Sequence, residues 1–266
     1  MALELNDVIY EKHHRVRGAA WITINRPKAL NAYTNDCAKE IGLAFEDATN
    51  DPTVGVIVLT GAGDRGFCTG GDVRGMLDNT QGGQGFEGLI DPDVFVENCP
   101  KPVIARVNGY AIGGGNHLAY TCDLSIACEE HAKFGQVGPR VGSPASGRPV
   151  ASLAYNIGMK KAKELWYMTK VYDAQQALDM GLINKHVPHD RLDGEIDEWT
   201  ADLMTKSGSC LRILKATFDT VYDPLKQPNR KWVEELTPNF YASGESAEGQ
   251  QAFLEKRAPD FAKYAR

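Results

Sequence analysis

A buried strand followed by a glycine-rich turn and a helix occurs twice in this sequence, and this repeat constrains the fold most strongly. Val54–Thr60 is a continuous apolar, β-branched run of strand length, and the glycine-rich stretch Gly61–Gly71 follows it. Pro102–Val107 repeats the run and leads through Gly113–Gly115 into a helical segment at Asn116–Thr121. Such runs suit strands buried on both faces of a parallel sheet. The repeat therefore predicts an α/β core with right-handed crossovers.

The remaining chain extends this pattern and then becomes wholly helical. Two further strands are expected at Asp123–Ala127 and Ile183–Val187, and strand signals stop after the second of them. We therefore predict a core over residues 1–206 and a C-terminal helical module over residues 207–266. The segment Asp78–Asp91 is rich in Gly, Asn and Gln and lacks periodicity. A lid beside a site is the preferred interpretation, with a disordered loop as the alternative.

Composition and charge exclude several classes of protein. A chain of 266 residues with 42% hydrophobic residues can bury a sizeable core. No apolar run approaches the roughly 20 residues that span a bilayer, and the N-terminus lacks a secretion or transit signal, so a soluble, cytoplasmic protein is expected. The formal charge of -6 and the lack of a basic cluster argue against nucleic acid as a partner. The cysteines and histidines form no C-x-x-C, H-x-x-H or H-E-x-x-H motif, so neither disulfides nor a metal is predicted.

The two glycine turns can serve one chemical purpose. Convergence of two backbone N–H groups on one oxygen requires the close backbone approach that glycine allows, and a helix N-terminus supplies free N–H donors. Each such donor typically stabilises an oxyanion in the transition state by about 2.7 to 4 kcal/mol. Ordinary connecting turns are the open alternative. A nucleotide phosphate loop is disfavoured, because G-x-x-x-x-G-K-[ST] is absent.

Several motifs resemble the crotonase (enoyl-CoA hydratase/isomerase) superfamily in order and in separation. They are Asn25–Ala32 (NRPKALNA), Gly66–Asp72 (GFCTGGD), Lys101–Gly115 (KPVIARVNGYAIGGG) and the tail Phe253–Arg257 (FLEKR). The resemblance covers nearly the whole chain. It implies an α/β spiral of ββα repeats with a C-terminal helical module that forms homotrimers, commonly paired into hexamers. It also implies an acyl-CoA thioester as substrate, with coenzyme A bound as part of that substrate and no tightly held cofactor.

The same resemblance assigns roles to individual residues. Gly71 and Gly114 match the two positions whose N–H groups form an oxyanion hole. Asp72 is expected to cap the helix that follows it. The positions matched to coenzyme A contacts are Lys28, Ala29, Gly70, Asp72 and Arg74 on one subunit, with Phe253 and Lys256 from a neighbour.

Within the superfamily the sequence is most similar to a branch that handles ring substrates. This branch contains the 1,4-dihydroxy-2-naphthoyl-CoA synthases and the 2-ketocyclohexanecarboxyl-CoA hydrolases. The most diagnostic segments are Phe134–Pro139 (FGQVGP) and the tail Glu255–Phe261 (EKRAPDF).

Departures from the family pattern narrow the chemistry. Simple hydratases of the superfamily hold and split water with two glutamates, and those positions here carry His117 and Gly138. Gly138 is expected to leave room for a water or an anion. The ring-handling branch has an aspartate two residues after the serine matched by Ser143, where this chain has Ala145. Gly147-Arg148-Pro149 replaces a glycine-tyrosine-glycine nearby, so a reaction identical to that of either relative is not implied.

Five side chains remain candidates for acid–base chemistry or substrate binding. His117 follows Gly114 on the first turn of a helix, and an imidazole can act as base or acid near neutrality. Tyr241 matches a tyrosine that donates a hydrogen bond to the substrate carbonyl, often across a subunit boundary. Ser143, together with Ser146, could hold a water or a second oxyanion, and Arg148 could pair with a substrate carboxylate. A structural role in packing or on the surface is the alternative for each.

The leading hypothesis is hydrolytic cleavage of a carbon–carbon bond in a cyclic β-keto acyl-CoA, a retro-Claisen ring opening through a thioester enolate. Hydration or isomerisation of an unsaturated acyl-CoA is the enzymatic alternative, and ring closure of the naphthoate-synthase type is a further one. A catalytically degenerate subunit that only binds coenzyme A is the non-enzymatic alternative. The intact glycine turns count against it, because a scaffold has no need of an oxyanion hole.

Overall fold

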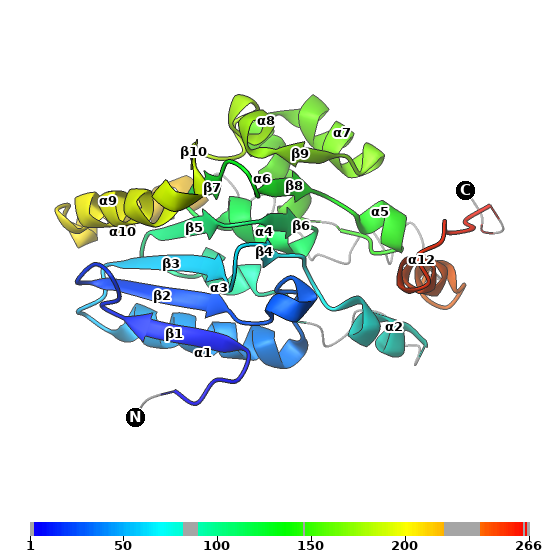
Figure 1. Cartoon of the computed structure of the whole chain (residues 1–266), viewed down its shortest axis with the longest axis horizontal. Helices are drawn as coiled ribbons and strands as arrows, with labels where there is room; N and C mark the ends of the chain where they lie inside the picture. Colours follow the sequence, from blue (N-terminus) through cyan, green and yellow to red (C-terminus); the bar gives the residue numbers. More distant parts are fainter. Residues whose placement is uncertain (1–2, 82–89, 146, 221–239, 263, 265–266) are drawn as a thin grey trace.

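Six strands form the larger of two β-sheets in the computed structural model, which describes residues 3–81, 90–145, 147–220, 240–262 and 264. The strands lie in the order β1-β2-β3-β5-β7-β10 (Figure 1). The first two form an antiparallel hairpin, and the later pairings in this sheet are parallel. The strands are β1 (Val8–Lys12), β2 (Ala19–Ile24), β3 (Val56–Gly61), β5 (Val103–Val107), β7 (Leu124–Cys128) and β10 (Lys185–Val187).

Four short strands form a second sheet, in the order β4-β6-β8-β9. They are β4 (Gly66–Cys68), β6 (Tyr110–Ile112), β8 (Lys133–Gly135) and β9 (Val171–Asp173). Along the chain, β3, β5 and β7 of the large sheet are followed by β4, β6 and β8 of the small one, and a helix then follows each pair. This order is a spiral of ββα repeats, so the predicted α/β architecture is confirmed.

The two faces of the large sheet pack against different layers. Ile57 and Leu59 of β3 face the main hydrophobic core with α1 (Asn35–Asn50). Val56 and Val58 face a second, smaller cluster that contains residues of α9 (Leu192–Met204). Successive side chains on a strand point to opposite faces, so an unbroken apolar run is what a strand covered on both sides requires.

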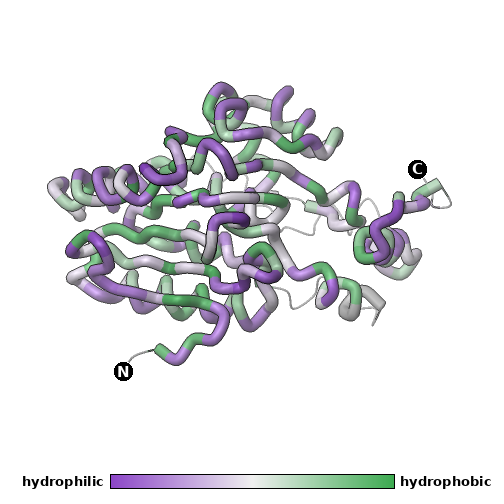
Figure 2. Tube along the Cα trace, viewed as in Figure 1, coloured by the Kyte–Doolittle hydropathy of each residue, from purple (hydrophilic) through white to green (hydrophobic). Residues whose placement is uncertain are grey.

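Helices cover both sheets, and a side-chain cap marks the start of the first α-helix. The Thr34 hydroxyl accepts a hydrogen bond from the Cys37 N–H at 3.2 Å and caps α1. None of the helices in the described residues has the length and apolar content needed to span a membrane, and Figure 2 shows hydrophilic and hydrophobic residues mixed along them. The other helices are α2 (Val73–Gln81), α3 (Asp93–Glu97), α4 (Gly114–Thr121), α5 (Gly138–Val141), α6 (Arg148–Ile157), α7 (Met159–Met168), α8 (Ala174–Asp179), α10 (Gly208–Asp219) and α12 (Glu245–Leu254), with 3-10 turns η1 (Pro27–Ala29) and η2 (His189–Arg191).

The segment predicted as a lid begins as a helix. α2 extends to Gln81, so the first residues of Asp78–Asp91 continue a helix rather than a loop. Residues 82–89 of that segment, and residues 221–239 of the predicted C-terminal helical module, lie outside the described residues.

The two described helices of the C-terminal region lie far apart. Figure 1 shows α10 beside α9 at one end of the molecule and α12 at the other end, near α2 and α5. Lys215 of α10 joins the core through its Nζ, which lies 2.7 Å from Asp123 Oδ2. The division at residue 206 therefore stays a prediction, and so does the trimerising role of residues 207–266.

Candidate active site

The two glycine turns meet at one edge of the small sheet. β4 and β6 pair in parallel, so the turns that leave their carboxyl ends emerge side by side. The turns are in close contact, because a Cβ atom built on Gly70 would lie 2.9 Å from the Gly114 nitrogen. Gly70 also has a φ of 86°, in the left-handed region that glycine adopts readily. A side chain at this position would force the turns apart.

Hydrogen bonds to Tyr33 fix the orientation of the Gly71 N–H group. The Tyr33 N–H donates to the Gly70 carbonyl at 2.9 Å, and the Asp72 N–H donates to the Tyr33 carbonyl at 2.8 Å. These bonds form a parallel bridge between Tyr33 and Gly71. Successive N–H groups of extended backbone point to opposite sides, so the Gly71 N–H points away from Tyr33.

The second N–H donor belongs to Gly114, the first residue of α4. The N–H of a first helical residue has no acceptor within its own helix. Gly113 precedes it with a φ of 57°, which lets the chain turn sharply from β6 into the helix. Neither the Gly71 N–H nor the Gly114 N–H donates to an acceptor among the described residues. Two free N–H donors therefore lie on adjoining turns, the arrangement that an oxyanion hole needs.

Tyr33 packs against both turns, and the sequence motifs did not single it out. A Cβ atom on Gly114 would lie 2.4 Å from the Tyr33 Oη, and one on Gly71 would lie 3.7 Å from its ring. The Tyr33 hydroxyl donates to Asp91 Oδ1 at 3.2 Å. Burial raises the pKa of Tyr33 well above its usual value, with a further contribution from Asp91, so the phenol stays neutral. The sequence offered one signal for Tyr33, its position directly after the motif Asn25–Ala32.

His117 lies one turn into α4, where its N–H donates to the Gly113 carbonyl at 3.0 Å. The imidazole is flanked by the rings of Tyr120 and Trp166, each with its centroid 5.7 Å away. Its Nε2 atom is buried and has no hydrogen-bond partner among the described residues.

Burial lowers the pKa of His117 below its usual 6.5. The Asp91 carboxylate and the Gln136 side chain act in the opposite direction without reversing this shift. The imidazole is therefore neutral at pH 7, and a neutral imidazole nitrogen can accept a proton. Asp91 is the second functional candidate that the sequence did not reveal.

Gly138 does not leave the room that its lack of a side chain indicated. A Cβ atom at this position would lie 2.4 Å from the Ser143 carbonyl oxygen. The Ser143 N–H donates to the Gly138 carbonyl at 2.9 Å and holds that backbone in place. A side chain at this position would therefore require the Ser143 backbone to shift, although Gly138 itself lines the cavity.

A cavity of about 770 Å³ joins these groups. Gly71, Gly114, His117 and Ser143 line it, with the side chain of Trp166 as part of the wall. The coenzyme A candidates that line it are Lys28, Ala29, Gly70, Asp72, Arg74 and Phe253.

Some of these lining residues also have structural partners. Asp72 accepts the Arg74 N–H at 3.1 Å, as a helix cap does, and lies 3.4 Å from Arg26 Nη2. Phe253 belongs to α12 of the same chain and is 55% exposed, so it reaches the cavity without a neighbouring subunit. Lys256 is exposed and is not part of the cavity wall.

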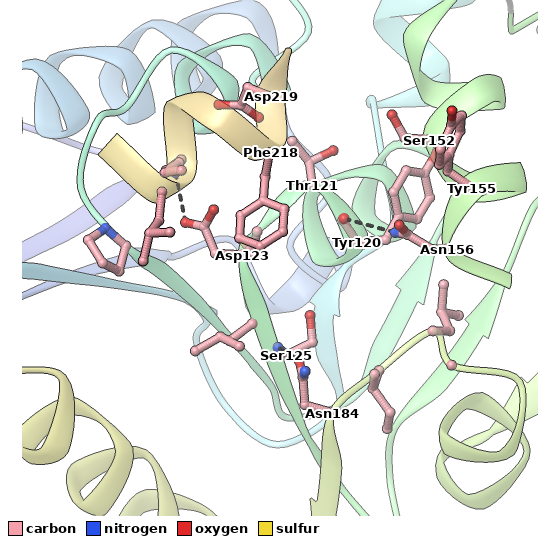
Figure 3. A pocket seen from close by; sticks show the side chains of 18 of the residues that line it. Tyr120, Thr121, Asp123, Ser125, Ser152, Tyr155, Asn156, Asn184, Phe218 and Asp219 are labelled. Atoms are coloured by element: carbon pink, nitrogen blue, oxygen red, sulfur yellow. Dashed lines mark hydrogen bonds and ion pairs between the residues drawn. The ribbon is translucent and has the colours of Figure 1, made fainter. Parts of the chain in front are cut away.

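Arg148 lies away from this cavity, contrary to the role proposed from the sequence. Its Nε atom is 2.9 Å from Glu97 Oε1, and its Nη2 atom is 3.4 Å from Asp219 Oδ1. It lines a second cavity of about 640 Å³ between α10 and the core, where Figure 3 shows Phe218 and Asp219 opposite Tyr120 and Thr121. The two carboxylates, from α3 and α10, hold the guanidinium and explain its place.

Of the two remaining candidates, Tyr241 lies outside the described cavity wall and Ser146 is not among the described residues. Tyr241 is half-buried and packs edge-to-face on Phe240 at 5.3 Å. The catalytic role of Tyr241 therefore stays a prediction, as do the roles of the cavity residues.

The stretch Gly61–Gly66 (GAGDRG) spells G-x-G-x-x-G, the pattern of dinucleotide-binding loops. In those loops a helix N-terminus follows at once and binds the pyrophosphate. Here the stretch joins β3 to β4, so it leads into a strand instead. The geometry gives no support to a dinucleotide site.

Comparison with known proteins places this architecture among acyl-CoA enzymes. The family model described as enoyl-CoA hydratase/isomerase matches residues 14–264. The chain is similar to a solved monofunctional enoyl CoA isomerase from M. smegmatis, with 32% identity over 82% of this chain and 94% of the other and a TM-score of 0.68. An enoyl-CoA hydratase from Mycobacterium avium subsp. paratuberculosis K-10 is 26% identical over 97% and 99% of the two chains, with a TM-score of 0.79. A methylmalonyl-CoA decarboxylase, 22% identical over 98% and 100% with a TM-score of 0.86, shares the fold.

The ββα spiral and the paired glycine turns together define an acyl-CoA-processing enzyme of the crotonase superfamily. Within that class, the enoyl-CoA hydratase/isomerase family model matches residues 14–264. The chain belongs to the enoyl-CoA hydratase/isomerase family. The superfamily assignment and the enzyme assignment are thereby confirmed, and the narrower ring-handling branch stays a prediction.

Proposed function

We propose that this enzyme hydrolyses a carbon–carbon bond in a cyclic β-keto acyl-CoA by retro-Claisen ring opening. The observation that carries the proposal is the state of His117, a neutral imidazole whose buried Nε2 is unpartnered within the described residues. Among the described residues of the cavity wall, only His117 and Asp72 have side chains that accept a proton near neutrality. Asp72 is engaged with Arg26 and the Arg74 N–H. The site therefore offers one free base.

A single base suffices for ring opening. His117 takes a proton from a water molecule, and the resulting hydroxide attacks the ring ketone carbon. The bond between that carbon and the α-carbon then breaks, and its electron pair moves into the thioester, whose enolate oxygen is held by the Gly71 and Gly114 N–H groups. Protonation of the α-carbon by the imidazolium gives a linear thioester with a new carboxylate and restores the neutral base.

Two-glutamate hydration has less support. One glutamate position carries His117, and at the other the Ser143 carbonyl oxygen lies 2.4 Å from the place of a Gly138 Cβ. A water held between two carboxylates therefore has no counterpart here.

Isomerisation of an enoyl-CoA is the second candidate. One base can remove an allylic proton and return it two carbons away, and the 32% identical relative from M. smegmatis is described as a monofunctional enoyl CoA isomerase. This reaction uses the same enolate stabilisation and needs no activated water. Ring closure of the naphthoate-synthase type needs the same enolate stabilisation, but nothing in the described cavity wall favours that direction.

Mass spectrometry of products formed in ¹⁸O-labelled water separates these reactions. The substrates are 2-ketocyclohexanecarboxyl-CoA, cyclohexenecarboxyl-CoA and crotonyl-CoA. Ring opening gives a linear dicarboxylic thioester with one label in the new carboxylate, and this product should be lost in His117→Ala and retained in the exposed-residue control His13→Ala. A labelled hydroxyacyl-CoA with an intact ring would refute ring opening. Unlabelled double-bond isomers would establish the second candidate, and thioester binding without turnover of any substrate would support the degenerate subunit.

A further inference from the structure

A group of metal-ligating side chains lies at the edge of the large sheet, outside the cavity just described. β7 ends at Cys128 and β10 ends at Val187, and these two residues are direct neighbours in the parallel register. His131 follows on the turn after β7, and His189 opens the 3-10 turn η2 after β10. Because parallel strands end at the same edge, the fold brings together side chains that lie some sixty positions apart in the sequence.

The distances within this group suit a metal ion. The potential ligand atoms of Cys128, His131 and His189 all lie within 4.8 Å of one another. Cys128 Sγ is 3.7 Å from His189 Nδ1, and the two imidazole centroids are 5.0 Å apart. Zinc–nitrogen bonds of about 2.0 Å and zinc–sulfur bonds of about 2.3 Å place tetrahedral ligand atoms roughly 3.3 to 3.6 Å apart. The pair Cys128–His189 is close to this spacing, and the ligand atom of the exposed His131 lies within 4.8 Å of both.

Glu130 offers a carboxylate oxygen beside this group. Its Oε2 atom accepts a hydrogen bond from the Cys128 thiol at 3.2 Å and one from the His189 N–H at 2.9 Å. The carboxylate thus already bridges the sulfur and the second histidine. When a metal displaces the thiol proton, this oxygen lies beside the ion, either as a direct ligand or as the group that orients the others.

Cys128 is buried, and its thiol donates a hydrogen bond to Glu130 Oε2 at 3.2 Å. A divalent cation that binds the sulfur displaces the thiol proton to solvent.

We propose that Cys128, His131 and His189, with Glu130, bind Zn²⁺ as a structural site. One thiolate and two imidazoles are ligands that zinc accepts, and the Glu130 carboxylate beside them would complete the coordination directly or orient the ligands. The ion would join the turn after β7 to η2, which leads directly into α9. The spacing Cys128-x-x-His131 alone did not reveal it, because the third ligand joins only through the pairing of β7 with β10.

The test uses cobalt as a spectroscopic substitute for zinc in the full-length protein. After removal of metals with EDTA and dialysis, Co²⁺ is titrated and Zn²⁺ is then added to displace it. The variants are Cys128→Ser, His131→Ala, His189→Ala and Glu130→Gln. Matched controls are Cys210→Ser, which removes a thiol outside this group, and His186→Ala, which removes a histidine of β10 outside this group. Circular dichroism establishes that each variant is folded, and the exposed positions of His131 and His189 make loss of fold an unlikely confounder for those two.

The expected result is one Co²⁺ per chain with a thiolate-to-cobalt charge-transfer band that zinc abolishes. This band should be absent in Cys128→Ser and retained in both controls, and Kd should rise at least about tenfold in His131→Ala and His189→Ala. Zn²⁺ should raise the Tm of the wild type and of both controls, but not that of His131→Ala. The proposal is overturned if the wild type shows no charge-transfer band, if the band disappears in Cys210→Ser, or if the histidine variants bind as tightly as the wild type.

Discussion

Replacement of Gly114 by alanine should nearly abolish turnover, whereas the same change at Gly71 should be far milder. At Gly114 the new methyl group would lie 2.4 Å from Tyr33 Oη, 3.2 Å from Tyr33 Cζ and 3.3 Å from the Gly70 Cα. None of these neighbours can move freely, because backbone hydrogen bonds tie Tyr33 to Gly70 and Asp72. The turn itself must therefore shift, and the Gly114 N–H is displaced with it.

The size of the effect follows from the loss of one oxyanion donor, which lowers kcat by about 10² to 10³-fold, or about 2.7 to 4 kcal/mol. At Gly71 the methyl group would meet Met76 Cε at 2.1 Å, the far end of a flexible side chain, and the next contacts are at 3.6 and 3.7 Å. Met76 can rotate away, so we expect a loss of about tenfold or less in Gly71→Ala. Gly75→Ala is the matched control, because no atom lies within 4 Å of its Cβ position.

The assay is kcat and KM on the acyl-CoA that the enzyme turns over, with Tm measured for each variant. A double variant, Gly114→Ala with Tyr33→Phe, removes the nearest oxygen and should recover part of the lost kcat, which a double-mutant cycle quantifies. The reasoning is refuted if Gly114→Ala stays within tenfold of the wild type, or if Gly71→Ala is impaired as severely as Gly114→Ala.

Three further outcomes follow from the same structure. The acid limb of kcat/KM should have its midpoint below pH 6.5, because His117 must be neutral and burial lowers its pKa. Asp91→Asn should move that midpoint lower still, since the Asp91 carboxylate raises the His117 pKa. A shift of the midpoint to higher pH would contradict this reasoning. Gly138→Glu should lower Tm without creating hydration of crotonyl-CoA, because a backbone carbonyl oxygen lies 2.4 Å from the Cβ position. Arg148→Ala should lower the free energy of unfolding, measured by urea titration, by about 3 kcal/mol, because a largely buried ion pair is lost. A changed KM with unchanged stability would instead indicate that Arg148 acts in the active site.

The large sheet could be predicted from the sequence, and the small one could not. Val56–Leu59 is an unbroken apolar run and Val103–Val107 is apolar apart from Arg106, so burial on both faces is encoded in each strand by itself. The small sheet consists of three-residue strands such as Gly66–Cys68, which are too short to show a period. Their extended backbone is set by pairing with neighbours that lie far away in the sequence.

The same distinction applies to the site. Gly71, Gly114 and His117 could be placed from local motifs, because each lies on or beside a turn that follows a recognisable strand. Tyr33 joins the site through backbone bonds to Gly70 and Asp72, and Asp91 joins it through a side-chain contact with Tyr33, 58 positions away. The misplacement of Arg148 has the same origin, since its carboxylate partners come from α3 and α10.

Because Tyr33 holds the residues on either side of Gly71, the turn is rigid before any thioester arrives. The Tyr33 amide proton is bonded to the Gly70 carbonyl and the Asp72 amide proton to the Tyr33 carbonyl, whereas the amide proton of Gly71 has no such bond. Native-state hydrogen exchange should therefore alternate along this short segment, with slow exchange at Asp72 and fast exchange at Gly71. Such preorganisation means that the entropy of ordering the turn is lost during folding, so ligand binding adds protection at Gly71 without reorganising its neighbours.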